Sequence, residues 1–176
     1  MAYFLFKCWR ERLFSVEAEE LVSCKSKVSI DFVPITRDNA HLVRELRGEI
    51  YEEQFLTQLS LGDFGYYAYC CGKPVGYGWA KHSGSDDYFF KIAEGACYLC
   101  RFFVHESVRG QGIYPELICA LAQREVSASH PRRFYIAAER GNTSSERGLL
   151  KVGFKFLREY GFLRGFKHTF NKKTLK

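Results

Sequence analysis

The sequence of 176 residues lacks several features that would assign it to a specialised class of protein. No apolar run approaches the ~20 residues that a membrane-spanning helix needs. Residues 1–12 contain a short apolar patch but neither a basic leader region nor a small-residue cleavage site, so we expect a cytoplasmic protein. No repeat, linker or low-complexity segment divides the chain, and its length fits one folded domain with a core of its own.

The seven cysteines do not complete a metal-binding pattern. Without a secretion signal they are expected to be reduced thiols. Cys97 and Cys100 spell C-x-x-C, but residues three apart on a strand point to opposite faces and cannot share one metal ion. Adjacent Cys70 and Cys71 fail for the same reason, and no second C-x-x-C pair or histidine-rich run is present. We therefore expect no metal cofactor.

Positive charge is concentrated in the second part of the chain. Residues 1–100 carry a net charge of −3 and residues 101–176 a net charge of +9. A basic region of this kind attracts a polyanion, either a phosphate-bearing cofactor or a nucleic acid. A nucleic-acid-binding module would need an exposed basic stripe with interleaved aromatic residues. Here the basic residues are scattered among apolar ones, so a solvated face accounts for most of them.

A strand, a glycine turn and a helix follow one another between Tyr98 and Ala122. Residues 99–104 are nearly all apolar, which predicts a strand buried on both faces. The turn contains Arg109-Gly110-Gln111-Gly112, and Pro115 fits the first turn of the helix, where its missing N–H costs nothing. One face of that helix is marked by Leu117, Ile118, Leu121 and Ala122.

This turn predicts an anion site, because free backbone N–H groups and a helix N-terminus meet there. Gly110 and Gly112 would let the backbone approach a phosphate without an intervening Cβ. Pro115 stands where a dinucleotide fingerprint needs a third glycine, and no Gly-Lys-Ser/Thr ending completes a P-loop. The alternative is an ordinary glycine-rich turn between a strand and a helix.

The turn resembles the acyl-CoA-binding motif of the GNAT superfamily of N-acyltransferases, Gln/Arg-x-x-Gly-x-Gly/Ala. Arg109 and Gly112 match this motif, whereas Tyr114 replaces its final small residue. Residues 142–154 resemble a second motif of the family, in which an asparagine opens a short helix that ends in Lys-x-Gly-Phe. A helix and the apolar strand 134–138 lie between the two motifs, in the order of the family. The chain is thereby identified as a member of this superfamily.

The resemblance implies an α/β (or α+β) fold, with a mixed, largely antiparallel sheet of six or seven strands and helices on both faces. The family holds acyl-CoA in a V-shaped opening between two splayed strands, here residues 96–104 and 134–138. The backbone of Phe102, Phe103 and Val104 would pair with the pantetheine amides, although core packing also explains three apolar residues. The residues expected around the pyrophosphate are Arg109, Gly110, Gln111, Gly112, Ile113 and Tyr114.

Two of these implied binding residues have a second interpretation. Asn142 would reach the pantetheine with its side chain, or would serve only as the N-cap of its helix. Tyr114 adds a bulky ring where the family prefers no side chain. Its ring must point away from the cofactor, or the pyrophosphate binds in a different position.

The function implied by the resemblance is transfer of an acetyl group from acetyl-CoA to a primary amine by direct attack in a ternary complex. CoA is then a co-substrate, and the acceptor is a small molecule or a peptide. No nucleic acid or membrane is expected as a partner, and the sequence is compatible with a homodimer. The alternative is a catalytically silent acyl-CoA-binding module of the same fold, which would keep the CoA motif and lack an acid and a base.

Catalysis needs a base for the ammonium and an acid for the leaving thiolate. Many family members have a tyrosine acid seven residues after the motif asparagine, where this chain has Leu149. The strand face that would hold the base carries Ala96, Tyr98 and Cys100, which include neither a carboxylate nor a histidine. The catalytic candidates are therefore Tyr98, as a polar relay, and Glu94, acting through water.

The remaining sequence predicts an N-terminal extension, residues 1–27, and the acetyltransferase-like domain, residues 28–176. Phe6, Trp9 and Leu13 fall on one helical stripe, which predicts a helix docked on the domain. Patterns further along predict a strand at 28–36, helices near 39–46 and 51–59, and a hairpin of strands 64–71 and 75–82. Residues 155–160 and 162–170 predict a closing hairpin that turns at Gly161.

Three aromatic residues, Tyr51, Phe55 and Phe64, lie where the family lines its acceptor site, between the first strand and the hairpin. They are candidates for that wall. Packing in the core is the alternative interpretation of the same residues.

Overall fold

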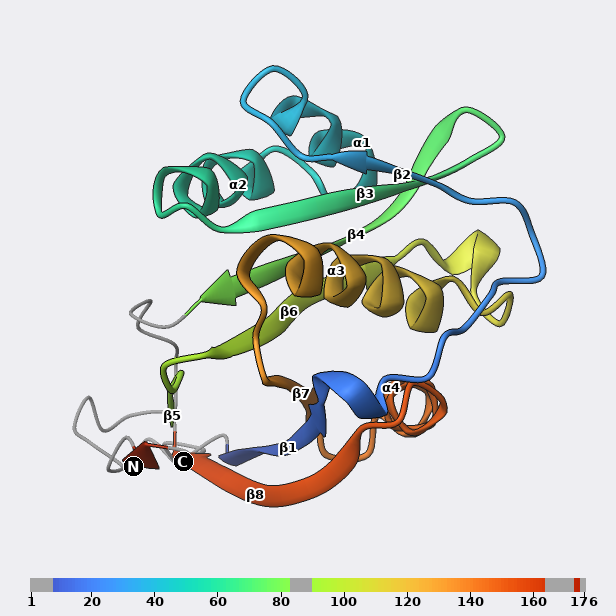
Figure 1. The fold of residues 1–176 in the computed structure, drawn as a ribbon. Coiled ribbons are helices and arrows are strands. Elements are labelled where there is room, and N and C mark those ends of the chain that lie inside the picture. The colour runs from blue at the N-terminus through green and yellow to red at the C-terminus, as the bar shows by residue number, and fades with distance from the viewer. Residues whose placement is uncertain (1–7, 83–89, 164–172, 175–176) are drawn as a thin grey trace, which may run out of the picture.

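The fold is built on a seven-stranded sheet (Figure 1). The computed structural model describes residues 8–82, 90–163 and 173–174. The strand order is β2-β3-β4-β6-β7-β1-β8, and every neighbouring pair is antiparallel except β6 and β7. The strands are β1 (Cys8–Glu17), β2 (Asp31–Pro34), β3 (Phe64–Cys70), β4 (Lys73–His82), β6 (Ala96–Val104), β7 (Arg133–Glu139) and β8 (Lys155–Leu163). The predicted mixed, largely antiparallel sheet is confirmed.

Four helices and three short 3-10 turns connect these strands within the described residues. The helices are α1 (Val43–Arg47), α2 (Ile50–Ser60), α3 (Ile113–Ser129) and α4 (Thr143–Lys151). The 3-10 turns are η1 (Ala18–Glu20), η2 (Ala40–Leu42) and η3 (Glu106–Val108). A separate parallel pair joins β5 (Phe90–Lys91) to β9 (Lys173–Thr174).

The sheet separates two hydrophobic cores. On one face Leu99 and Phe134 pack with α3 and α4, and on the other face Trp79 and Tyr135 pack with α1 and α2. Phe134 and Tyr135 are neighbours in β7 and lie in opposite cores, each at most 1% exposed. Helices therefore cover both faces, as predicted, and the inner strands are apolar on both sides.

The predicted N-terminal helix is wrong, because residues Cys8–Glu17 form β1. This strand lies between β7 and β8, with Phe14 opposite Ile136 on one side and Phe156 on the other. Leu13 and Phe14 are both buried, in different cores. A strand covered on both faces lacks the alternation of apolar and polar residues that identifies strands in a sequence. The apolar residues of this segment therefore matched a helical spacing by chance. Phe6 lies outside the described residues.

The predicted turn at Gly161 is also wrong. Gly161 lies within β8, opposite Arg10 of β1, and the strand continues to Leu163. The strand that pairs with β8 comes from the N-terminal segment, and Figure 1 shows the two side by side. The predicted second arm of the hairpin falls mostly on residues 164–170, outside the described residues.

The chain between β1 and β2 crosses the helices on one face of the sheet. The Val22 N–H donates to the Val152 carbonyl oxygen at 3.0 Å, and the Lys27 N–H donates to the Gln111 carbonyl oxygen at 2.7 Å. This segment therefore joins the end of α4 to the glycine turn before α3. In the described part of the chain, no helix has the length and hydropathy needed to cross a bilayer.

The position of β1 can be tested by truncating a buried side chain. Leu13→Ala is expected to lower the free energy of unfolding by about 2–4 kcal/mol, because Leu13 is fully buried in the core beside β7. Leu150→Ala is the matched control, since Leu150 is 59% exposed on α4, and it should change stability by less than about 0.5 kcal/mol. Urea denaturation measures both, and equal effects would contradict the burial of β1.

Candidate functional site

Strands β6 and β7 diverge after a short parallel pairing. Their register runs only from Ala96 opposite Arg133 to Leu99 opposite Ile136. Just beyond, Arg101 has a φ of +53°, and the register of β6 against β4 shifts between Tyr77 and Trp79. A positive φ at a residue other than glycine is uncommon and marks a β-bulge here, which bends β6 away from β7.

The divergence leaves one edge of β6 facing the opening. The His105 N–H donates to the Val75 carbonyl oxygen of β4 at 2.8 Å, and the Phe103 carbonyl oxygen also lies against β4, beside Gly76. Backbone groups alternate between the two edges of a strand, so those of Phe102 and Val104 point into the opening. The Val104 carbonyl oxygen accepts a hydrogen bond from Arg109 Nε at 3.1 Å.

A cavity of about 860 Å³ occupies this opening, and we call it the cleft. It extends from the splayed strands to the glycine turn and to the start of α4. Most of the residues predicted to bind CoA line it: Phe102, Phe103, Val104, Arg109, Gly110, Gly112, Ile113, Tyr114 and Asn142. The structure thus brings together two motifs that are about thirty residues apart in the sequence.

The glycine turn has the backbone conformation that its sequence requires. Gly110 and Gly112 have φ values of +78° and +85°, and Gly112 is the N-cap of α3. A Cβ at Gly110 would meet nothing within 4 Å, whereas one at Gly112 would lie 3.3 Å from Ser26 Cα. Gln111 is not among the residues that line the cleft. Its carbonyl oxygen accepts from Lys27, which fixes the turn from outside.

The Tyr114 ring packs between β6 and α4. It meets Phe102 edge-on at a centroid distance of 5.3 Å, and a Cβ on Gly148 would lie only 2.7 Å from its Cδ1 atom. Burial raises the pKa of Tyr114, and a hydrogen bond to Ser145 opposes this rise. The ring that replaces the small residue of the motif is therefore accommodated by a glycine on the facing helix.

The position of Asn142 is compatible with both of its predicted roles. Its Oδ1 atom accepts a hydrogen bond from the Ser145 N–H at 3.1 Å, which makes it the N-cap of α4. The same residue is exposed and lines the cleft. Its NH₂ group can therefore donate to a ligand while its oxygen caps the helix.

Both catalytic candidates lie near the start of β6, but only Tyr98 lines the cleft. Tyr98 is buried and lines the cleft. Glu94 is exposed, precedes the first residue of β6, and is not among the residues that line the cleft. Leu149, at the position of the family's tyrosine acid, is fully buried in the core under α3 and α4.

Two carboxylates that sequence reasoning missed reach the cleft. Glu11 on β1 and Glu139 on β7 are opposite each other in the register, and both line the cavity. Burial raises the pKa of Glu11, and the charge of Glu139 raises it further. No local sequence signal marks Glu11, because its place depends on β1 joining the sheet beside β7.

The aromatic residues predicted for the acceptor wall separate into two groups. Tyr51 and Phe55 line a second hollow of about 170 Å³ on the α2 side of the sheet. The Arg47 guanidinium lies over the Tyr51 ring there, at 4.3 Å. Phe64 lies on the other face of the sheet, with the Arg124 guanidinium 3.7 Å from its ring centroid. Phe64 therefore does not face that hollow.

Comparison with known proteins agrees with this geometry. Residues 34–154 match the model of the acetyltransferase (GNAT) family. The chain belongs to this family. A search of curated protein sequences finds no significant match.

Solved structures share the GNAT fold at low sequence identity. A functionally unknown conserved protein from Staphylococcus epidermidis has a TM-score of 0.66 at 17% identity, over 90% of this chain and 62% of that one. A GCN5-related N-acetyltransferase from Kribbella flavida has a TM-score of 0.64 at 13% identity, over 90% and 59%. This GNAT chain thus spans about 60% of the length of these two proteins.

A third structure matches over nearly its whole length. Aminoglycoside N-acetyltransferase AAC(6')-Iy in complex with CoA has a TM-score of 0.59 at 20% identity, over 78% of this chain and 95% of that one. At such identities the likeness establishes the fold alone.

The packing of Tyr114 on α4 predicts a coupling between two residues of the cleft wall. Gly148→Ala should destabilise the protein by about 1–3 kcal/mol, because the new Cβ overlaps the Tyr114 ring. This cost exceeds the gain of up to about 1 kcal/mol in helix propensity. In a Tyr114→Ala background the same change should be neutral or stabilising. Urea denaturation of the four variants measures the coupling, and additive effects would contradict the contact.

Proposed function

We propose that this protein transfers an acetyl group from acetyl-CoA to a primary amine by direct attack in a ternary complex. The observation that carries the proposal is the composition of the cleft. One cavity joins the open edge of β6, the glycine turn at the N-terminus of α3, and the carboxylate of Glu11. These are the parts needed to hold a phosphate-bearing thioester and to deprotonate an amine.

The donor half of the cleft fits acetyl-CoA. The backbone groups of Phe102 and Val104 can pair with the two pantetheine amides as an added strand. The Gly110 and Gly112 region offers backbone N–H groups and the positive end of a 17-residue helix to the pyrophosphate. A cavity of about 860 Å³ is also in the size range of ligand sites.

In the acceptor half, Glu11 is the base that we propose in place of Glu94. Its carboxylate takes a proton from the ammonium, and the free amine attacks the thioester carbonyl carbon. The new C–N bond forms as the C–S bond breaks, and the thiolate takes a proton from Tyr98, Tyr114 or water. The acylated nitrogen then loses its extra proton, which restores the group that protonated the thiolate, so that a neutral amide and free CoA remain. A carboxyl group with a raised pKa suits the role of base, since general bases work best when their pKa is near the working pH.

Two fold relatives act on amines according to their names. One is the aminoglycoside N-acetyltransferase described above, and another is a ribosomal-protein-alanine N-acetyltransferase from Brucella melitensis, with a TM-score of 0.55 at 18% identity. Their acceptors differ in size and chemistry, so they support an amine acceptor without selecting one. A screen of amines that reads out free CoA would identify the acceptor.

One observation favours the alternative, an acyl-CoA-binding module without activity. Leu149 is fully buried at the position where the family has its tyrosine acid, so the chain lacks that acid. Proximity of the reactants supplies much of the rate for a reactive thioester, and Glu11 supplies a base, so we favour an enzyme. Acetyl-CoA binding without transfer to any amine would support the binding module instead.

A matched pair of substitutions at Gly110 tests the phosphate site. Asparagine and aspartate both tolerate the positive φ of this position, and a Cβ there meets no other atom within 4 Å. Gly110→Asp should weaken CoA binding at least about tenfold more than Gly110→Asn, because only aspartate adds a negative charge beside the pyrophosphate. Calorimetry measures both dissociation constants. Equal values would contradict a phosphate site at this turn.

The pH dependence of turnover tests Glu11. In the wild type, kcat/KM should rise with pH through an apparent pKa above the ordinary carboxyl value of 4.5, since Glu11 must be ionised to act. Glu11→Gln should lower kcat by about 10²-fold or more and remove this limb of the profile. In the sheet, Glu11 lies opposite Glu139 of β7 on one side and Tyr160 of β8 on the other, so these two residues are its cross-strand neighbours.

Glu139→Gln is the control for this experiment. It removes a neighbouring negative charge, so ionisation of Glu11 becomes easier and the limb should move to lower pH without being lost. An unchanged rate and profile in Glu11→Gln would remove Glu11 from the mechanism. Such a result would leave the CoA-binding half of the proposal intact.

A further inference from the structure

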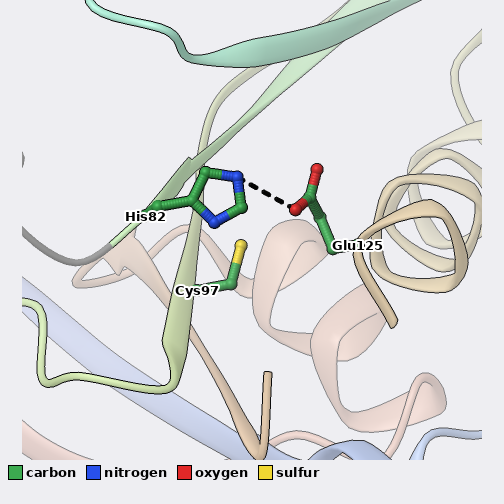
Figure 2. A group of neighbouring side chains, drawn as sticks. All are labelled: His82, Cys97 and Glu125. Carbon is green, nitrogen blue, oxygen red and sulfur yellow. Dashed lines mark ion pairs between the residues drawn. The ribbon is translucent and has the colours of Figure 1, made fainter. Parts of the chain in front are cut away.

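Three side chains with metal-binding atoms meet at the end of the sheet opposite the cleft (Figure 2). His82 ends β4, Cys97 is near the start of β6, and Glu125 lies in the last part of α3. A ring nitrogen of His82, the Cys97 Sγ and a carboxylate oxygen of Glu125 all lie within 4.8 Å of one another. None of the three lines the cleft, so their arrangement has no role in the proposed acetyl transfer.

The group is buried except on one side. Cys97 and Glu125 are both 0% exposed, whereas the His82 side chain is 36% exposed. His82 Nε2 lies 3.0 Å from Glu125 Oε2, and Figure 2 shows the imidazole, the thiol and the carboxylate pointing toward one another. The exposed side of His82 gives an entry path for a small ion.

The carboxylate is held in place by neighbours on its other sides. Arg124 pairs with Oε1 of Glu125, and the Ser129 Oγ donates to Oε2 at 3.1 Å. Metal-binding carboxylates in proteins are commonly oriented by such outer hydrogen bonds. Arg124 already balances part of the charge of Glu125, but Oε2 still faces His82 and Cys97.

We propose that His82, Cys97 and Glu125 form a binding site for a divalent cation of the zinc class. An imidazole nitrogen, a thiolate sulfur and a carboxylate oxygen are together typical of zinc, whereas Mg²⁺ and Ca²⁺ prefer oxygen atoms alone. Ligand atoms at tetrahedral zinc are about 3.4–3.8 Å apart. His82 Nε2 and Glu125 Oε2 are already 3.0 Å apart, so only the distances to Cys97 Sγ, which are at most 4.8 Å, would shorten, by up to about 1 Å. Side-chain rotation can supply a movement of that size.

Metal binding would change the protonation of the group. Burial raises the pKa of Cys97 well above its ordinary value, and the charges of Glu125, Cys100 and Asp63 raise it further, while a backbone hydrogen bond from Lys81 opposes them. Without a metal the sulfur is thus a thiol, and on binding it releases its proton to solvent. The cation would also add a positive charge beside a fully buried carboxylate.

Such a site would stabilise the fold. It would connect the last residue of β4 to the start of β6 and to helix α3, which packs across both strands. Three protein ligands leave the fourth position of the metal to water, on the exposed side of His82. The C-x-x-C spelling did not indicate this site, because Cys97 and Cys100 do face opposite cores and the partners of Cys97 come from other elements.

Cobalt is a suitable spectroscopic probe of the site in the full-length, metal-free protein. Addition of Co²⁺ should produce a thiolate-to-cobalt charge-transfer band with one-to-one stoichiometry, and Zn²⁺ should displace it while Mg²⁺ does not. At about 100 times its dissociation constant, Zn²⁺ should raise the melting temperature by about 5–10 °C. Absence of the band in the wild type would overturn the proposal.

Two substitutions of buried cysteines decide whether the band arises at this site. Cys97→Ser should abolish it and reduce the stabilisation by Zn²⁺, and His82→Ala should weaken cobalt binding at least tenfold. Cys119→Ser is the matched control, since Cys119 belongs to the same core but is hydrogen-bonded to the Val22 carbonyl oxygen, and it should keep the band. A band that survives Cys97→Ser, or is lost only in Cys119→Ser, would contradict the assignment.

Discussion

Strands β6 and β7 share only four register pairs, and the function that we propose depends on this limit. Beyond Leu99 the bulge at Arg101 turns β6 aside, so the backbone groups of Phe102 and Val104 face an opening rather than a strand. Polar backbone groups seldom stay unsatisfied in a protein interior. In the function that we propose, an extended ligand with amide groups would satisfy them, and the glycine turn at the end of the same strand would bind its phosphates.

The N-terminal strand serves both the fold and the chemistry. Because β1 pairs with β7 on the side away from β6, it covers the outer edge of β7 and leaves the divergence open. Leu13 and Phe14 anchor β1 in the two cores, and Glu11, two residues before Leu13, reaches the cleft from the same strand. The segment that follows then holds the glycine turn through Lys27 and Gln111. The segment from Glu11 to Lys27 thus contributes both to the cleft and to the support of its glycine turn.

The sequence predicted features that depend on local pattern. The strand 96–104, the glycine turn and the helix after it could all be recognised, because apolar runs, positive-φ glycines and helical spacing act over a few residues. Position in the sheet could not be predicted in the same way. The place of β1 beside β7 is a long-range pairing, and it alone brings Glu11 to the cleft and excludes a turn at Gly161. The meeting of His82, Cys97 and Glu125 is equally non-local, since three separate elements supply one side chain each.

Residue-resolved amide hydrogen exchange tests the central claim, that the open edge of β6 binds the pantetheine arm. The measurement compares the free protein with the protein saturated with CoA. The amides of Phe102 and Val104 should exchange more slowly in the complex, because they gain partners there. The amide of Leu99, which lies where β6 is already paired with β7, should change little and serves as the internal reference. CoA binding that leaves the exchange of Phe102 and Val104 unchanged would contradict the account.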